Sequence, residues 1–569
     1  MGKIAVLSGL VQARIAAGEV IERPASAVKE LVENSLDAGA TRIEIELEQG
    51  GRRRIRVCDD GEGMDAGDLA LSVERFATSK LRSEDDLARV ATLGFRGEAL
   101  PSLAAVAELE IVTRQRSAGN ALRLRMEPGG RPVMEPAAGP PGTSVEARAL
   151  FARVPARLKF LRSDATETSA VCEVVERLAL ARPDVAFRLR ADGKELLSAP
   201  QGQTLRERVA AVLGEEVARG LLELRAGERG WLAVEGLVQS PDAPARRDRR
   251  WGFLTLNRRP IKDRVLSHAV ESAYVSALPA GQFPTYVLHV GIDPSQVDVN
   301  VHPSKLEVRF RSSGSVHDFV SASVREALRR PAGAEARTLA PGPGGGGRAS
   351  RAAERRSTEQ FDLWRGGALA GESPAPFGEG PAPGARVIGS LREGYVLVET
   401  ERDLRIVDPH ALHERALYER LSRAASEGAT RSQTLLVPET VELSPAEAAT
   451  FERAKSALEE LGFVAEAFGG RTAIVRAVPE GVPSAASAEI LREVLSDLDS
   501  GGEGRSSELL ERVRRSLACR AAVKLGTRLD PAELAALVEQ SGGTPPTCPH
   551  GRPIAWVLTH EEIARRLGR

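Results

Sequence analysis

The chain has 569 residues, of which 42% are hydrophobic and 28% are charged. This length is several times that of a typical single domain, so it predicts several domains. The composition and the lack of any run of eighteen apolar residues argue against a disordered, collagen-like or membrane-embedded chain. The formal net charge of −1 indicates no particular partner, so a nucleic-acid role would depend on local clusters of cations.

The first twenty residues lack the charged, hydrophobic and cleavage regions of a secretory signal, so we expect a cytoplasmic protein with no membrane partner. The four cysteines, at positions 58, 172, 519 and 548, are too scattered to form a disulfide framework. We therefore expect reduced thiols or metal ligands.

Hydrophobic periodicity predicts alternating helices and strands through about residue 330, with strands at 42–47 and 54–57. Residues 331–386 are rich in Gly, Pro and Ala and show no apolar period, which is typical of a flexible linker. Strand-like runs then resume at 395–399 and 404–407, which indicates a carboxyl-terminal domain over 387–569.

Residues 25–38 are expected to form a helix with a polar stripe opposite its apolar side. Glu30, Asn34 and Asp37 lie along this stripe, where a general base and a magnesium ligand would face the same phosphate. An ordinary solvated face is the alternative for such a stripe. Asp59 ends a strand just before a glycine-containing turn that includes Gly63, and its carboxylate can accept a hydrogen bond from a base amino group.

A glycine-containing loop, Thr92–Leu100, leads into a helical stretch, and such backbone can bind phosphate at a helix amino terminus. Taken alone, this loop is a weak signal.

Near the start of the carboxyl-terminal domain, a strand is followed by a helix expected over 410–421. His410 and Glu414 are four residues apart, so one helix face carries an imidazole and a carboxylate that can hold a divalent metal, with Asp408 just before them. A surface His–Glu contact is the alternative. Cys548 and His550, expected in an extended segment, would point the same way and bind one ion, with Cys519 as a further soft ligand. Buried free cysteines are the alternative for the thiols.

Six segments of residues 1–330 resemble, in order, the motifs of the MutL family of DNA mismatch repair ATPases: KELVENSLDAGAT, DDGEGM, RFATSK, TLGFRGEAL, GTSVEARALFARVPARLKFL and DVNVHPSKLEVRF. The wider superfamily of gyrase, the ninety-kilodalton heat-shock chaperone and histidine kinases shares only the first elements. The resemblance implies an α/β and α+β multidomain fold. Its expected parts are a GHKL-type ATPase sandwich (1–205), a transducer-like α/β domain (206–330), the linker (331–386) and a mixed α/β dimerisation and endonuclease domain (387–569).

The same resemblance implies that ATP and Mg²⁺ bind to the amino-terminal domain, with Glu30 as general base, Asn34 as magnesium ligand and Asp59 as the adenine contact. Lys305 would reach the γ-phosphate from the second domain, where a compact ammonium group suits a phosphate. The remaining nucleotide-binding residues implied are Asp37, Gly63, Thr78, Ser79, Lys80, Gly94, Phe95, Arg96, Gly97 and Thr143.

The carboxyl-terminal half is similar to the members of this family that nick DNA. Their motif begins with Asp-Gln-His-Ala, and a Glu follows after two residues and a second Glu after four more. This chain matches the motif except that Pro409 replaces the glutamine, which leaves the geometry of Asp408 in question. Glu419, the last position of the motif, would fall on a different helix face from Glu414. The resemblance implies that Zn²⁺ or Mn²⁺ binds here and that Asp408 and Glu414 serve phosphodiester hydrolysis. The metal ligands implied are His410, Glu414, Cys519, Cys548 and His550.

Two basic stretches, Arg148–Arg162 and Arg246–Lys262, are candidates for DNA contact, the second with Trp251 and Phe253 among its cations. Gln360–Trp364 and Gln433–Pro438 resemble peptides that bind the DNA polymerase sliding clamp. The family further implies a homodimer and the mismatch-recognition protein MutS as partners. The alternative function is an ATP-regulated matchmaker that recruits a separate nuclease and does not cut DNA itself.

Overall fold

The computed structural model describes residues 20–80, 94, 97–243, 246, 249–275, 277–278, 282–298, 308–329, 386–391, 394–401, 403–426, 430–500, 506–522 and 547–567. Several predictions lie outside these residues, namely those for Phe95, Arg96, Lys305, the peptide 360–364 and almost all of the linker. The chain divides into two compact units, Met1–Arg329 with Arg420–Ala521, and Arg330–Glu419 with Ala522–Arg569.

An eight-stranded sheet forms the centre of the amino-terminal part, in the order β5-β4-β3-β6-β2-β1-β7-β8. Neighbouring strands are antiparallel except for the pair β1 and β7, which is parallel. The strands are β1 (Arg42–Glu48), β2 (Arg54–Asp59), β3 (Glu108–Arg114), β4 (Ala121–Met126), β5 (Val133–Ala137), β6 (Gly142–Arg148), β7 (Ala186–Ala191) and β8 (Lys194–Ala199).

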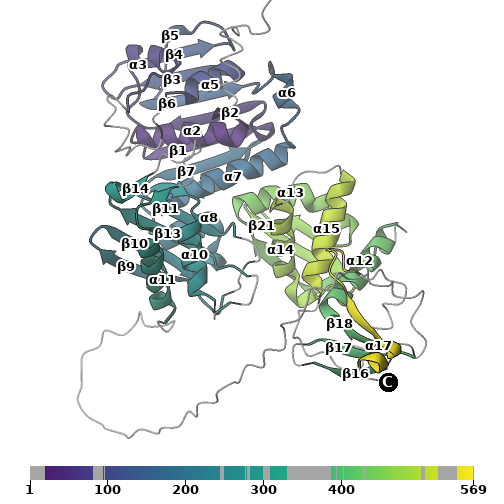
Figure 1. The fold of residues 1–569 in the computed structure, drawn as a ribbon. Helices are drawn as coiled ribbons and strands as arrows, with labels where there is room; N and C mark the ends of the chain where they lie inside the picture. Colours follow the sequence, from purple (N-terminus) through teal and green to yellow (C-terminus); the bar gives the residue numbers. More distant parts are fainter. Residues whose placement is uncertain are drawn as a thin grey trace, which may run out of the picture. The chain divides into compact units, whose positions relative to one another are not determined.

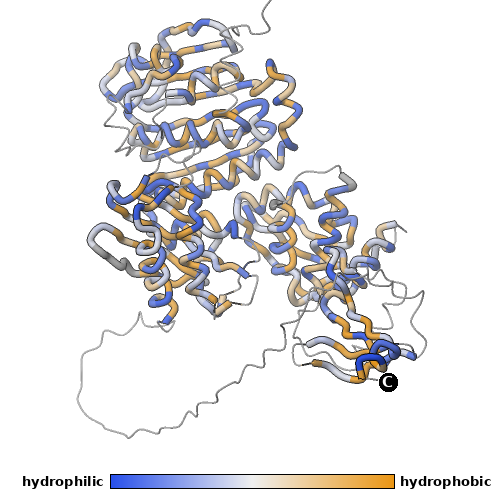
Figure 2. The backbone as a smooth tube through the Cα atoms, viewed as in Figure 1, coloured by the Kyte–Doolittle hydropathy of each residue, from blue (hydrophilic) through white to orange (hydrophobic). Residues whose placement is uncertain are grey.

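Helices α2, α5 and α7 lie across this sheet (Figure 1). The side chains of Ile43, Ile45 and Leu47 on β1 are buried, because alternate residues of a strand point to the same face. Hydrophobic and hydrophilic residues accordingly alternate along the strands (Figure 2). The helices of this part are α2 (Pro24–Asp37), α3 (Ala66–Leu71), α5 (Ala99–Val106), α6 (Pro155–Leu158) and α7 (Asp164–Ala181), with a 3₁₀ turn η1 (Gln49–Gly51).

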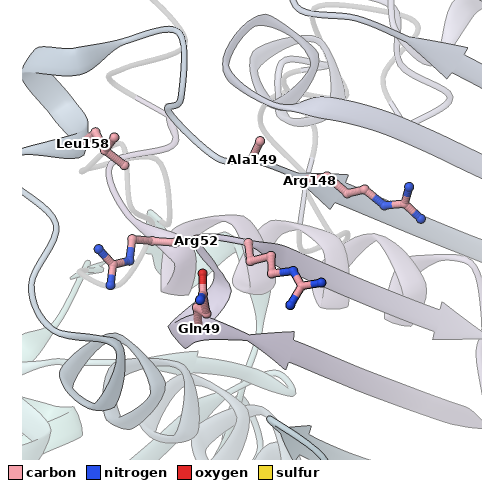
Figure 3. A pocket seen from close by; sticks show the side chains of 6 residues that line it. Gln49, Arg52, Arg148, Ala149 and Leu158 are labelled. Atoms are coloured by element: carbon pink, nitrogen blue, oxygen red, sulfur yellow. The ribbon is translucent and has the colours of Figure 1, made fainter.

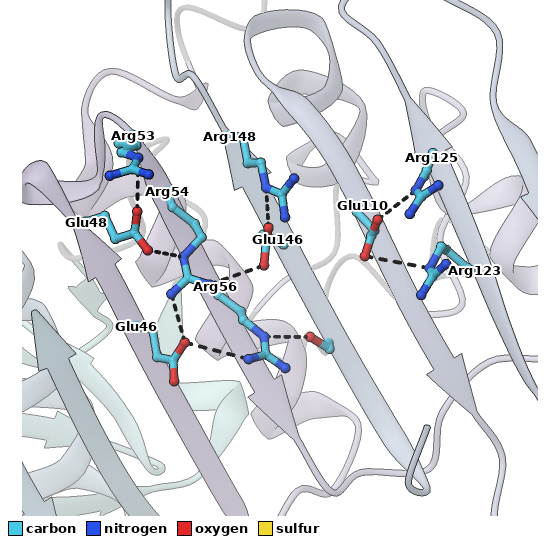
Figure 4. A network of polar contacts seen from close by, with 11 residues as sticks. Glu46, Glu48, Arg53, Arg54, Arg56, Glu110, Arg123, Arg125, Glu146 and Arg148 are labelled. Atoms are coloured by element: carbon cyan, nitrogen blue, oxygen red, sulfur yellow. Dashed lines mark hydrogen bonds and ion pairs between the residues drawn. The ribbon is translucent and has the colours of Figure 1, made fainter. Parts of the chain in front are cut away.

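The other face of the same sheet carries a network of arginine and glutamate side chains (Figure 4). The Arg54 guanidinium, for example, lies 3.1 Å from a carboxylate oxygen of Glu46 and 3.0 Å from one of Glu48. Cross-strand pairs of opposite charge each stabilise a sheet modestly. The charged residues of β1 and β2 therefore form the solvent side of the sheet whose apolar side is the core.

A second, five-stranded sheet has the order β12-β11-β13-β10-β9, with β11 and β13 parallel. Its core includes Val234, Leu288 and Val320, all with essentially no exposed surface. The strands are β9 (Leu221–Arg229), β10 (Leu232–Gln239), β11 (Gly252–Leu256), β12 (Arg259–Ile261) and β13 (Tyr286–Ile292). The other elements are α8 (Leu205–Leu213), α9 (Glu215–Arg219), α10 (Arg264–Ala273), α11 (Ser313–Arg329), a turn η2 (Pro294–Gln296) and the short pair β14 (Val297–Asp298) and β15 (Arg309–Phe310).

The predicted carboxyl-terminal domain is divided between the two units. The first unit contains a three-stranded sheet, β19-β21-β20, and the second a four-stranded antiparallel sheet, β16-β17-β18-β22. In the first, the elements are β19 (Ser432–Glu442), α13 (Pro445–Glu460), β20 (Val464–Ala467), β21 (Thr472–Pro479), η3 (Ser484–Ala486), α14 (Ser487–Ser500) and α15 (Ser506–Ala521). In the second they are β16 (Arg386–Ser390), β17 (Val396–Glu399), β18 (Asp403–Val407), β22 (Ala555–Thr559) and α17 (His560–Arg566), and α12 (Pro409–Ser426) begins there.

These elements confirm the predicted helices near 25–38 and 410–421 and the four predicted strands, with ends that differ by a few residues. No helix among the described residues is both long enough and apolar enough to cross a lipid bilayer.

Arg208 on α8 is a fully buried cation that joins several segments of the amino-terminal part. Its guanidinium donates hydrogen bonds to the carbonyl oxygens of Ala179, Pro183, Val185 and Pro200, at 2.7 to 3.2 Å. Burial lowers its pKa to about 10, so the group remains protonated at neutral pH. One side chain of α8 thus ties residues 179–185 and Pro200 together through four carbonyl groups.

We expect Arg208→Met to lower the free energy of unfolding by about 3 kcal/mol, because buried carbonyl groups lose their donors. The matched control is Arg188→Met, since Arg188 is half-exposed and pairs with Glu195 on the solvent side of the sheet. It should change the free energy by no more than about 0.5 kcal/mol. Urea titrations followed by circular dichroism measure both, and equal effects would contradict the assignment.

Candidate functional site

The polar stripe of α2 lies on its accessible side, as predicted. The opposite side is core, with Val28, Leu31 and Val32 buried, whereas Glu30, Asn34 and Asp37 remain partly exposed. The Lys29 ammonium lies 3.2 Å from a Glu30 carboxylate oxygen and 3.0 Å from one of Glu33. The stripe therefore combines carboxylates, an amide and a local cation on one face of a helix.

Asp59, at the end of β2, is a partly buried hydrogen-bond acceptor beside this stripe. Its Oδ2 accepts from the Ser35 hydroxyl at 2.8 Å, and its Oδ1 accepts from the backbone amides of Gly61 at 3.0 Å and Thr143 at 3.2 Å. Burial raises the pKa of the Asp59 carboxyl, although these hydrogen bonds oppose the increase. Helix α2, strand β2 and strand β6 are thereby held together around one carboxylate.

Glycines bring backbone close to Asp59. A Cβ at Gly142, where φ is +114°, would lie 2.0 Å from the Asp59 carbonyl oxygen, and one at Gly63, where φ is +72°, would lie 2.3 Å from that of Arg114. Because no side chain fits at either position, both are restricted to glycine. Thr143 is positioned further by its hydroxyl, which lies 3.0 Å from that of Thr113.

The predicted lid residues that the structure describes lie against the stripe or against one another. The Lys80 ammonium donates to Asn34 Oδ1 at 2.9 Å and Asp37 Oδ2 at 2.5 Å, and the Gly94 amide donates to Asp37 Oδ2 at 3.0 Å. The Thr78 hydroxyl accepts from the Lys80 amide at 3.2 Å, whereas Ser79 is exposed. A Cβ at Gly97, where φ is +61°, would lie 2.4 Å from the Ala77 carbonyl oxygen, so this position too requires glycine.

Several residues of this site were not found from the sequence. Ser35 and Thr113 position Asp59 and Thr143, and Lys29 pairs with the stripe. Arg259 on β12 is buried, and burial lowers the pKa of its guanidinium. The negative charges of Glu33, Asp37 and Glu30 on α2 oppose this decrease. No local signal reveals Arg259, because it comes from the second sheet, whereas the contact of Lys29 with Glu33 was detectable as an i, i+4 pair.

The first basic stretch borders an open pocket of about 640 Å³ (Figure 3). Its residues are Gln49, Arg52, Arg53, Arg148, Ala149 and Leu158. The arginines already pair with carboxylates, Arg53 with Glu48 at 3.2 Å and the others with Asp164 and Glu146. Next to it, Arg153, Lys159 and Arg162 are exposed, and Phe160 is 86% exposed.

The second basic stretch differs from the prediction in its aromatic residues. Trp251 and Phe253 are buried in the core, where the Arg246 and Arg177 guanidinium groups lie 4.0 and 5.1 Å from the respective ring centres. The expectation that these rings accompany cations at a DNA surface is therefore wrong, because strand β11 turns them inward.

In the second unit, Glu414, Cys548 and His550 bring three potential metal-ligand atoms within 4.8 Å of one another. Glu414 and Cys548 are buried, and Glu414 Oε1 accepts a hydrogen bond from His550 Nδ1. Burial tends to raise the pKa of the Glu414 carboxyl, but the hydrogen bond and charge of His550, with the charge of His410, lower it below its usual value. A carboxylate, a thiol and an imidazole form a donor set that suits zinc.

Cys548 and His550 do not lie in an extended segment, so that expectation is wrong. The backbone carbonyl oxygen of Cys548 accepts a hydrogen bond from the Gly551 amide at 2.9 Å, and Gly551 has a φ of +81°. The segment is therefore a tight turn. The turn is closed by the pairing of Thr547 with Pro553. It is the turn that directs both side chains toward Glu414.

Asp408 is the residue immediately before α12 and caps it. Its Oδ1 accepts from the amides of His410 at 2.9 Å and Ala411 at 3.2 Å. Pro409 is the first residue of the helix, where its missing N–H and fixed φ are tolerated. The replacement of glutamine by proline therefore fits the local backbone.

The other predicted residues of this site lie elsewhere. Glu419 pairs with Arg415 at 3.0 Å and is not in the cluster, as its helical position predicted. His410 is close enough to affect the Glu414 charge but is not among the three clustered ligands. Cys519 lies on α15, in the first unit, and its role as a ligand stays a prediction.

Three family models match the chain. They are the Histidine kinase-, DNA gyrase B-, and HSP90-like ATPase over residues 21–131, the DNA mismatch repair protein, C-terminal domain over 209–329, and the MutL C terminal dimerisation domain over 388–529. Together with the fold, they define a GHKL-type ATPase joined to a dimerisation domain, which supports a homodimer.

The chain is 39% identical to the DNA mismatch repair protein MutL of Geobacter sulfurreducens, over 100% of this chain and 99% of that protein. It is 40% identical to the MutL of Anaeromyxobacter dehalogenans, over 100% of each chain. The chain therefore belongs to the MutL family of DNA mismatch repair proteins. It is also similar to the solved Aquifex aeolicus MutL ATPase domain complexed with ADP, with 28% identity, a TM-score of 0.37, and coverage of 48% of this chain and 94% of that chain.

The family resemblance implies that Asp59 contacts the adenine amino group. On that assignment we expect Asp59→Asn to weaken ATP binding by roughly ten- to a hundredfold, because the contact would lose a charged acceptor. The variant should nevertheless be at least as stable as the parent at pH 7. Folding raises the pKa of Asp59, so above that pKa the ionised carboxylate destabilises the fold, and a neutral amide removes this effect.

Asp60→Asn is the matched control and should behave in the opposite way. Although burial opposes it, hydrogen bonds from Thr41 and Arg42 lower the pKa of Asp60, so its ionised form stabilises the fold above its unfolded pKa. This variant should lose stability at pH 7 and retain ATP affinity. Calorimetric titration with ATP and urea unfolding measure both properties, and unchanged ATP affinity in Asp59→Asn would refute the adenine assignment.

Proposed function

We propose that this protein is an ATP-switched DNA-nicking enzyme of mismatch repair, with the nucleotide site on α2 and β2 and a metal-dependent nuclease site at α12. The observation that carries the nicking proposal is the convergence of Glu414 and His550, 136 residues apart in the chain, with Cys548. Glu414 lies on a helix that Asp408 caps.

The residues of the amino-terminal site fit an adenine nucleotide with Mg²⁺. The partly buried Asp59 carboxylate would provide an acceptor for the adenine amino group, and close backbone packing at Gly142 and Gly63 helps to hold it in place. Asn34 Oδ1 is the hard oxygen ligand assigned to magnesium, with Asp37 beside it. The bound ion would neutralise phosphate charge.

Glu30 is the general base in this proposal. Its carboxylate is partly exposed beside Asn34 on the same helix face and would orient water toward the γ-phosphate. Lys80, Gly94 and Gly97 belong to the segments assigned to the lid, with Thr78, Ser79, Phe95 and Arg96. Lys305 is assigned to the γ-phosphate from its motif alone.

The donor set at α12 fits Zn²⁺ or Mn²⁺, with Glu414, Cys548 and His550 as the ligands that the geometry supports and His410 and Cys519 as further predicted ones. A bound ion would supply charge to the oxygens of a phosphodiester. Both cap hydrogen bonds of Asp408 go to Oδ1, so we assign Oδ2 to the water or the DNA strand.

For DNA, we propose the surface around α6 as a phosphate-binding region. Its exposed cations are Arg153, Lys159 and Arg162, with Phe160 beside them. Such contacts would bind DNA with little sequence preference and strong dependence on salt. Of the second stretch, the exposed Arg249 and Arg258 would contribute, without Trp251 and Phe253.

For the sliding clamp, the segment 433–438 is supported by its exposure. The β19–β21 register shifts between Thr434 and Glu439, and Leu436 and Val437 are 100% and 76% exposed. Apolar side chains held in water on a strand irregularity are typical of a docking peptide. MutS remains the proposed partner that signals a mismatch.

We expect the purified protein to nick supercoiled plasmid in the presence of Mn²⁺, and Asp408→Asn to reduce the rate about a hundredfold or more. Asparagine also caps helices well, so the start of α12 should be preserved while the carboxylate is lost. Agarose gel assays of open-circle formation measure the rate.

Two further variants define this experiment. Glu562→Gln removes another carboxylate of the same unit, one that pairs with Arg566, and should nick at the parent rate. Glu30→Ala should lose ATP turnover and keep Mn²⁺-dependent nicking in the absence of ATP. If the parent nicks no DNA with Mn²⁺, ATP, MutS and clamp present, the matchmaker function replaces the nicking proposal.

We expect Leu436→Asp to weaken clamp binding about tenfold or more while leaving the unfolding midpoint unchanged, since this side chain is fully exposed. Phe468→Asp removes another exposed apolar residue, 61% accessible, from a turn following β20, and should bind the clamp normally. Surface plasmon resonance measures the affinity. Unchanged affinity when Leu436→Asp is combined with Trp364→Ala would exclude both peptides.

A further inference from the structure

Lys80 places a positive charge against oxygens that the proposed magnesium site uses. Its Nζ lies 2.9 Å from Asn34 Oδ1 and 2.5 Å from Asp37 Oδ2. The Lys80 and Asp37 side chains are only 17% and 8% exposed. A charge-assisted contact with so little water around it is stronger than a surface ion pair.

Gly94 closes over the same group. Its amide donates to Asp37 Oδ2 at 3.0 Å, and a Cβ at this position would lie 3.1 Å from Lys80 Nζ and 3.6 Å from Asn34 Oδ1. The ammonium thus lies between α2 and Gly94, which follows Lys80 in the chain. The segments of Lys80 and Gly94 were both assigned to the lid from the sequence.

An ammonium group and a divalent ion cannot occupy this position together. Both seek the Asn34 oxygen, and the repulsion between the two cations at contact distance in a partly buried site is large. Lysine suits the position better than arginine, because its ammonium group is small and concentrates its charge. It can approach two oxygens almost as closely as a metal ion does. Lys80 is one of nine lysines in a chain with 78 Lys and Arg residues.

We propose that Lys80 is an internal competitor for magnesium: in the nucleotide-free protein its ammonium occupies the cation position at Asn34 and Asp37, and Mg²⁺–nucleotide binds only by displacing it. The proposal rests on the assignment of Asn34 as the magnesium ligand and adds to the assignment of Lys80 as a nucleotide contact. Displacement frees the ammonium to follow the negative charge to the phosphates. It also breaks the contact that holds residues 78–80 against α2, so cation exchange is coupled to lid movement.

The test measures Mn²⁺ binding to the nucleotide-free full-length chain, with the spectrum of free Mn²⁺ in electron paramagnetic resonance as the readout. All samples carry Cys548→Ser and His550→Ala, so that the cluster at α12 does not contribute. Lys80→Met should bind Mn²⁺ about tenfold more tightly than the parent. In the parent, only molecules that have released the ammonium can bind the ion, whereas in the variant the site is open in every molecule. Lys80→Gln should do the same.

Two controls separate competition from a general change of charge. Lys80→Arg should restore much of the competition, and Lys194→Met, which removes an exposed lysine ammonium elsewhere in the same unit, should bind Mn²⁺ as the parent does. Equal Mn²⁺ affinity of the parent, Lys80→Met and Lys80→Gln would overturn the proposal. So would an equal gain in Lys194→Met.

Adding Asn34→Ala to Lys80→Met should abolish the gain. If the gain survives this change, the assignment of Asn34 as ligand fails, and the proposal fails with it. If Lys80→Met shows no gain because Lys80 does not compete, ATP hydrolysis and its dependence on Asn34 should remain intact. The failure of this proposal is therefore distinguishable from the failure of the proposed function.

Discussion

The negative charge on the accessible side of α2 is the constraint on which the amino-terminal half of this protein depends. The other side of the helix is packed into the core, so its carboxylates cannot turn away from one another or be left without positive charge. They are Glu30 and Asp37, which are partly exposed, and Glu33, which is buried. The cations come from the helix itself, from the lid and from the second sheet: Lys29, Lys80 and Arg259. The negative charge of this helix is thus offset by side chains from three regions.

With a nucleotide on α2, this arrangement would connect its binding to the lid segment and to the five-stranded sheet. Phosphates and magnesium bring their own charges, so they change the balance that holds Lys80 and Arg259 near α2. Lys80 belongs to the proposed lid and Arg259 to the five-stranded sheet, so a change of charge at the stripe would act on both. The two-layer packing of α2 on the eight-stranded sheet keeps the stripe itself fixed while its partners change.

The cluster in the second unit is built differently, from a capped helix and a tight turn. Asp408 caps α12 with one carboxylate oxygen, Pro409 continues the helix without loss of a required donor, and Glu414 follows one turn later. The turn at Cys548 brings a thiol and an imidazole to that carboxylate. Each of these side chains belongs to an element with its own backbone hydrogen bonds, and such preorganisation would favour a metal site.

The sequence by itself determined the elements and the chemistry within each of them. Helical spacing placed Glu30, Asn34 and Asp37 on one face, and strand alternation separated Ile43 from the charged face of β1, because both depend only on local backbone geometry. Only the tertiary structure decided which elements meet. It brought Arg259 to α2, turned Trp251 and Phe253 into the core, and formed a turn where an extended segment was expected at Cys548. Contacts between distant segments depend on packing of whole sheets and helices, and no local pattern encodes that packing.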